Sequence, residues 1–227
     1  MRSFPIILKK EGKNGIRMPD KTYFRDLRVP TTENPLRILV SACLTGIKCG
    51  VDGDNYGDYP SVLKLMEYDN VKLISFCPED LAFGTPRETC DIHGGSGMDV
   101  LEGRAKVLTE SGIDWTEGMI SAAEKMLEVA IANNIELAIM MDVSAACGSH
   151  VIYDGSRFAE NKKYQIGMGV CGAQLARAGF KVVSQREFET LELLYSKIDS
   201  SHKVDSAARD FNQHEWYLEY FSTTDLK

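Results

Sequence analysis

Three cysteines stand at corresponding places in the sequence, each just after a short apolar segment. Cys43 follows the first segment, Cys77 the second and Cys147 the third, and a glycine or proline comes within a few residues of each. Thiolates are common ligands of zinc and of iron–sulfur clusters. We therefore predict that the three cysteines are ligands of one metal centre, and an iron–sulfur cluster is the first choice.

Spacing alone leaves other chemistries open. Zinc would need a fourth ligand, which Cys49, His150 or His93 could supply, although the sequence has no Cys-x-x-Cys pair. A [4Fe–4S] cluster on three thiolates would leave one iron open to a substrate. A nucleophilic cysteine would want a base such as His150. A metal-free binding module remains a further alternative, because free cysteine is often simply buried; we read Cys171, inside a predicted helix, in that way.

Polar residues suited to proton transfer and substrate binding lie close to these cysteines. Glu79 comes two residues after the second cysteine, and Ser144 comes three residues before the third. A partly desolvated carboxylate gains proton affinity, as a general acid or base requires. We predict Glu79 and Ser144 as catalytic residues, and Asp52 and Arg87, in neighbouring loops, as substrate-binding residues.

The apolar segments predict a parallel sheet that would position these residues. Strands are expected at residues 36–42, 71–76, 136–141 and 180–184, with a short extended segment at 151–153. Helices are expected at 60–68, 117–134, 167–178 and 186–197, and a loop at 80–98. Alternating strands and helices indicate an α/β fold, a Rossmann-like three-layer sandwich with a mostly parallel sheet. The carboxyl ends of parallel strands share one edge, where ligands bind, so distant cysteines can converge there.

The same patterns predict the ends of two helices and the domain organisation. Thr116 is expected to cap the helix at 117–134, and Gly179 to end the helix at 167–178. The chain divides into an N-terminal extension (1–35), one α/β domain (36–188) and a helical tail (189–227). The tail is marked by four aromatic residues, Trp216, Tyr217, Tyr220 and Phe221.

Composition limits the partners and the compartment. The 227 residues carry a net charge of -7 and form no basic cluster, so nucleic acid is not an expected partner. No apolar run approaches the ~18 residues of a membrane span, and the N-terminal run is too short for a secretory signal. We predict a cytoplasmic protein whose six cysteines are metal ligands or core residues, not disulfides. The oligomeric state is left open, with a dimer as one possibility.

Several short segments, in order, resemble a bacterial family whose characterised members are 2-thiouracil desulfidases. The matching segments are residues 40–46, 52–53, 77–79, 84–87, 97–100, 144–148, 152–155, 167–170 and 182–184, so the resemblance spans about residues 36–186. It implies a [4Fe–4S] cluster held by Cys43, Cys77 and Cys147, labile in air because its fourth iron is open. That iron would bind the sulfur of a small thiolated base, and water would replace the sulfur with help from Glu79 and Ser144.

The chain departs from the family's usual pattern beside two of these segments. The usual Ser-Pro-Ser-Cys-Gly is Ser-Ala-Ala-Cys-Gly here, from Ser144 to Gly148. The usual Arg-Tyr before Asp-Gly is Gly50-Val51. A serine and an arginine beside the expected substrate site are therefore missing, while the three cysteines are kept.

Overall fold

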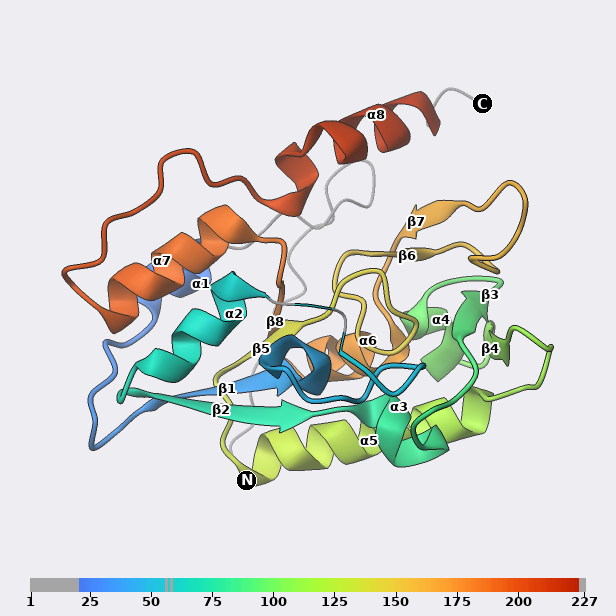
Figure 1. The fold of residues 1–227 in the computed structure, drawn as a ribbon, viewed down its shortest axis with the longest axis horizontal. Coiled ribbons are helices and arrows are strands. Elements are labelled where there is room, and N and C mark those ends of the chain that lie inside the picture. The colour runs from blue at the N-terminus through green and yellow to red at the C-terminus, as the bar shows by residue number, and fades with distance from the viewer. Residues whose placement is uncertain (1–20, 56, 58, 225–227) are drawn as a thin grey trace.

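A four-stranded parallel sheet forms the centre of the protein (Figure 1). The computed structural model describes residues 21–55, 57 and 59–224. Neighbouring strands lie in the order β2-β1-β5-β8, and every pair is parallel. The α/β fold with a mostly parallel sheet is confirmed. The strands are β1 (Leu36–Ser41), β2 (Val71–Phe76), β5 (Leu137–Met140) and β8 (Lys181–Ser184).

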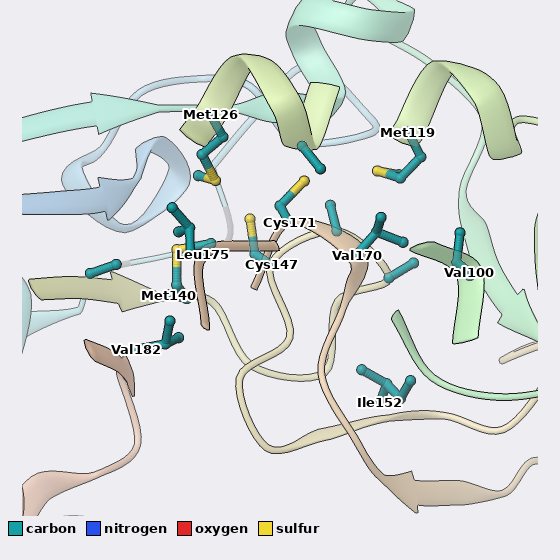
Figure 2. Close-up of a cluster of buried hydrophobic side chains, with 14 of the residues drawn as sticks. Val100, Met119, Met126, Met140, Cys147, Ile152, Val170, Cys171, Leu175 and Val182 are labelled. Carbon is teal, nitrogen blue, oxygen red and sulfur yellow. The ribbon is translucent and has the colours of Figure 1, made fainter. Parts of the chain in front are cut away.

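Helices cover both faces of this sheet and bury two separate cores. Alternate side chains of a strand point to opposite faces, so Ala138 and Met140 join one core while Leu137 and Ile139 join the other. Figure 2 shows part of the first core. None of the helices in the described ranges is long and apolar enough to cross a membrane. The first core lies against α3 (Pro78–Phe83), α4 (Gly97–Leu101), α5 (Thr116–Ala132) and α6 (Val170–Arg177), the second against α1 (Lys21–Asp26), α2 (Pro60–Leu63) and α7 (Phe188–Ile198).

Two antiparallel hairpins and several short helices fill the connections. β3 (Cys90–His93) pairs with β4 (Lys106–Thr109), and β6 (Val151–Tyr153) pairs with β7 (Tyr164–Ile166). The predicted loop at 80–98 is therefore wrong, because it contains most of α3, all of β3 and the start of α4. These elements have four to six residues, which is too short for a periodic pattern.

Two helix ends show how local groups set the boundaries. The predicted Thr116 cap is wrong: Thr116 is already helical, and its N–H donates to the carboxylate of Asp114 at 3.0 Å. The Thr116 hydroxyl instead accepts the N–H of Val107 at 3.0 Å. Gly179 follows the end of α6 with φ of +91°, as expected of a left-handed residue that terminates a helix.

The predicted helix at 167–178 begins only at Val170, because its glycines lie in close backbone contacts. A Cβ added to Gly97 would lie 2.4 Å from the carbonyl carbon of Gly169. The N–H of Gly169 donates to the carbonyl of Gly148 at 2.8 Å. Close packing therefore accounts for this glycine-rich stretch, and the N–H of Gly169 is used inside the protein.

The described parts of both terminal extensions pack against the α/β body. Phe24 of α1 is fully buried, and the Arg28 guanidinium forms two 2.7 Å hydrogen bonds with the Glu136 carboxylate. After α7 come the 3-10 turn η3 (Phe211–Gln213) and α8 (Glu215–Thr224), which lies beside the hairpin of β6 and β7 (Figure 1). The predicted arm at residues 1–20 lies outside the described residues, and the boundaries at 35 and 188 stay predictions.

Candidate active site

The carboxyl ends of three neighbouring strands open onto one pocket. β2 and β5 lie on opposite sides of β1, so the order in which the strands are added to the sheet changes direction at β1. Ligands of open α/β sheets usually bind at such a point. The pocket has a volume of about 490 Å³, within the range of small-molecule sites. Five cysteines line it, together with Glu79, Arg87, Ser144 and an aromatic and basic rim; the cysteines are Cys43, Cys49, Cys77, Cys90 and Cys147.

The three cysteines that follow strands reach this pocket from a 3-10 turn, from a helix N-cap and from a loop. Cys43 lies in the 3-10 turn η1 (Ala42–Thr45) directly after β1. Cys77 is the N-cap residue of α3, where its sulfur accepts the N–H of Asp80 at 3.4 Å. Cys147 lies in the loop after β5, inside the core shown in Figure 2. The structure therefore brings Cys43, Cys77 and Cys147 together, and their role as ligands stays a prediction.

The donors that the three predicted ligands offer on the pocket wall are thiols. Among the described residues, no three His, Cys, Asp or Glu side chains are close enough to hold one metal ion. Thiolates of a zinc site must all come within ~2.3 Å of the same atom. A [4Fe–4S] cluster presents a separate iron to each thiolate, so its ligands stand farther apart. The three cysteines of this pocket would supply the three thiolates that such a cluster needs.

Cys49 is a fourth thiol at the same place, although the sequence left its role open. It is 3% exposed, and the Cys77 thiol donates a hydrogen bond to its backbone carbonyl at 3.8 Å. The contact with Cys43, together with burial, raises the pKa of the Cys49 thiol to about 11. Cys171 is fully buried in α6, so its predicted core role is confirmed.

The surroundings of Cys77, Cys90 and Cys147 raise the pKa values of their thiols. Burial raises the pKa of Cys147 well above its usual value, and the hydrogen bond with Cys49, together with burial, does the same for Cys77. Burial also raises the pKa of Cys90. Because the thiolate is the form that binds metal, any metal bound by these thiols would release protons on binding.

The two histidines considered as zinc ligands, one of them also as a base for a nucleophilic cysteine, lie outside the pocket. His150 is 7% exposed, and its Nε2 atom lies 3.1 Å from the Glu187 carboxylate. Its ring stacks on Phe211 with a centroid distance of 4.2 Å. Neither His150 nor His93 is among the residues that line the pocket.

Glu79 and Arg87 form an ion pair on the pocket wall. The Arg87 side chain is 4% exposed, and its Nη2 atom lies 2.9 Å from Oε2 of Glu79. The same guanidinium donates to the carbonyls of Cys49 and Gly84 at 3.0 and 3.1 Å. The sequence predicted that Arg87 would contact substrate; the structure shows its guanidinium bound to Glu79 and to the backbone. Arg87 therefore fixes the Glu79 carboxylate.

Ser144 links Glu79 to the loop that carries Cys147. Its hydroxyl accepts the N–H of Ala146 at 3.2 Å and of Cys147 at 3.0 Å, and donates to Oε1 of Glu79 at 3.4 Å. One oxygen of Glu79 is thus held by Arg87 and the other faces Ser144. The sequence prediction that Glu79 and Ser144 lie near the cysteines matches their positions on the pocket wall.

A buried carboxylate shapes the start of this loop. One oxygen of Asp142 accepts three consecutive backbone N–H groups, from Ser149, His150 and Val151, at 3.1–3.3 Å. Val143, which lines the pocket, has φ of +58°, a left-handed conformation that a β-branched residue rarely adopts. The surrounding hydrogen bonds therefore hold a strained backbone at the base of the site.

Comparison with known proteins agrees with this geometry. The model of the 2-thiouracil desulfurase family matches residues 38–187, about two thirds of the chain. The chain belongs to the 2-thiouracil desulfurase family. An uncharacterized protein of Bacillus subtilis, YbbK, is 41% identical over 155 residues, which are 68% of this chain and 99% of YbbK. The solved structure of a [4Fe-4S]-dependent thiouracil desulfidase, TudS, is 31% identical over 72% of this chain and 99% of its own, with a TM-score of 0.57.

Of two neighbouring positions singled out in the sequence, one lies outside the pocket and the other lines it. Asp52 is exposed, its carboxylate accepts the N–H of Asp54, and it does not line the pocket. Its predicted contact with substrate has no support in the geometry. Val51, at one of the two positions that depart from the family pattern, does line the pocket.

The sequence reasoning missed the rim of the pocket. It consists of Tyr153, Arg157, Tyr164, Arg186 and Trp216. The Arg157 guanidinium is paired with Asp91 at 2.8 Å and lies 4.8 Å from the ring centre of Tyr153. The only sequence signal was the aromatic run around Trp216, which lies beyond the part matched by the family model.

Proposed function

We propose that this protein is an iron–sulfur-dependent desulfidase that removes sulfur from a thiolated pyrimidine such as 2-thiouracil. The observation that carries the proposal is the convergence of Cys43, Cys77 and Cys147 on one pocket that also holds Glu79. Family membership and the likeness to TudS support it. The described cysteines are all free thiols, as in a reducing compartment, which supports the proposed place in the cytoplasm.

The cysteines would hold a [4Fe–4S] cluster through their three thiolates. When bound, such a cluster supplies an iron without a protein ligand, a Lewis acid suited to the substrate's sulfur. The overall reaction replaces C=S by C=O: one water is consumed and one hydrogen sulfide leaves. No electrons are gained or lost, so the chain needs to supply only binding and proton transfer.

Glu79 is the group placed to move the proton. Its carboxylate lines the pocket and is 16% exposed, which keeps it in reach of both water and substrate. As a base it can accept a proton from the attacking water, and as an acid it can return that proton to the departing sulfur. Arg87 fixes one of its oxygens, and Ser144 contacts the other.

The proposal is tested by anaerobic reconstitution with iron and sulfide. We expect a brown protein with about four irons per chain that converts 2-thiouracil to uracil and releases one sulfide for each uracil. Metal analysis and separate measurements of sulfide and uracil provide the readout. A protein that stays colourless and iron-free after reconstitution would contradict the proposal, and one tightly held zinc per chain would favour a zinc protein instead.

The Ser144→Ala variant tests the proposed contact with Glu79. We expect kcat for sulfide release to fall about tenfold, since hydrogen bonds to charged groups contribute ~1.5–3 kcal/mol. Iron content should stay at the wild-type level. Ser149→Ala is the matched control, because that buried hydroxyl has no hydrogen-bond partner within the described part of the chain. Equal kcat values for the two variants would argue against a role for Ser144.

A further inference from the structure

The C-terminal helix α8 contributes a wall of the pocket although it lies outside the family's shared region. The family model ends at residue 187, and the two relatives are covered almost completely by about 70% of this chain. α8 spans Glu215–Thr224, and its Trp216 lines the same pocket as Cys43 and Glu79. An element added after the shared domain therefore touches the proposed reaction site.

Specific contacts hold α8 against the hairpin of β6 and β7. The backbone N–H of Tyr164 donates to the Tyr220 hydroxyl at 2.8 Å. The Tyr164 ring meets the ring of Trp216 edge-on at 5.1 Å between centroids. Tyr217 packs with Phe211 and Val151 in a small core of its own. These contacts hold the Trp216 indole at the pocket.

Trp216 is the rim ring best placed to receive a ligand. One face of Tyr153 is covered by the Arg157 guanidinium at 4.8 Å, and Tyr164 contacts three other aromatic rings. Trp216 also contacts three rings, those of Tyr164, Tyr220 and Phe221, but 42% of its surface stays exposed. Tyr153 and Tyr164 are only partly exposed, so exposure is what sets the indole apart. An exposed indole that lines a small-molecule pocket can stack on a flat heteroaromatic ring.

We propose that Trp216 is a specificity-determining residue that stacks on the substrate's pyrimidine ring and selects flat heteroaromatic thiones over non-aromatic thioamides. The inference rests on the proposed function, because it assumes the same pocket and the same substrate class. Stacking holds the ring in the ground state and the transition state alike, so its loss should raise KM and leave kcat nearly unchanged.

Steady-state kinetics of the reconstituted enzyme test this role. For Trp216→Ala we expect KM for 2-thiouracil to rise about tenfold or more, with kcat changed less than about threefold. Trp216→Phe should restore most of the affinity. The control is Leu218→Ala, on the same helix, because Leu218 is 49% exposed and does not line the pocket. A KM for Trp216→Ala equal to that of the control would overturn the inference.

A second measurement does not depend on activity. The chain has two tryptophans. The ring of Trp115 stacks on that of Phe83 with 3.9 Å between centroids, and Trp115 does not line the pocket. Titration with uracil should change the indole fluorescence saturably in Trp115→Phe, which keeps Trp216, and not in Trp216→Phe. Equal responses of the two variants would overturn the role of Trp216. A wild-type enzyme without desulfidase activity would overturn the proposed function instead, and the uracil titration would still decide whether the indole meets the ring.

Discussion

Replacing Cys77 with serine will leave the reconstituted protein with little iron and no measurable sulfide release. Serine keeps the size of the side chain but removes the thiolate, so the proposed cluster would lose one of its three protein ligands. The same result is expected for Cys43→Ser and Cys147→Ser. Iron and sulfide per chain, measured anaerobically beside the visible absorption of the cluster, provide the readout.

Cys49→Ser is the matched control for these three variants. Cys49 is more buried than any of the predicted ligands and lies in the same pocket, yet it follows no strand. We expect it to keep the wild-type iron content, while circular dichroism checks the folding of every variant. Loss of iron in Cys49→Ser together with full iron in one of the other three would show that the ligand set is wrong.

Glu79→Gln is expected to retain the cluster and to lose sulfide release by about 100-fold or more, the usual contribution of a general acid or base. The amide can still accept the hydrogen bond from Arg87, so the wall of the pocket should keep its shape, but it cannot exchange a proton with water. Iron content and the kcat for 2-thiouracil, measured on the same preparation, separate the loss of catalysis from the loss of the cluster.

Asp80→Asn is the control for Glu79→Gln. Asp80 is the next residue of α3, it is exposed, and it does not line the pocket. Removing its charge should change kcat less than about threefold, because its carboxylate accepts the Thr85 hydroxyl and the amide oxygen of asparagine can do the same. A Glu79→Gln enzyme that keeps more than half of the wild-type kcat would rule out Glu79 as the proton-transfer group.

The central sheet was predictable because its strands are short and rich in apolar residues, and β5 is a continuous apolar run. Leu137 to Met140 are all buried, so nothing but the length of the run was needed to recognise the strand. The short elements between residues 78 and 101 were not predictable in the same way. Their order depends on contacts such as the approach of Gly97 to Gly169, which joins segments about 70 residues apart. The hydrogen bond from the Thr116 N–H to the Asp114 carboxylate was missed because Thr116 itself offered the more familiar signal of a helix cap.

The site was predictable where topology alone places a residue. Cys43, Cys77 and Cys147 follow adjacent strands of one parallel sheet, so their meeting follows from the order of the strands. Cys49 reaches the pocket from a loop, and Trp216 reaches it from a helix distant in the sequence. No local sequence pattern predicts either position. Arg87 lies at the pocket as expected, but only the structure shows that its donors are taken by Glu79 and by carbonyl groups.

The two cores share Met141, which lines the pocket at the end of the sheet where the cysteines stand. Cys147 belongs to the core beneath α5 and α6, whereas Cys43 belongs to the core beneath α1 and α7. A group bound by both would act as a cross-link between two otherwise independent layers. Amide hydrogen exchange should therefore slow on both faces of the sheet when the cofactor is loaded, and its oxidative loss would loosen the whole domain rather than the pocket alone.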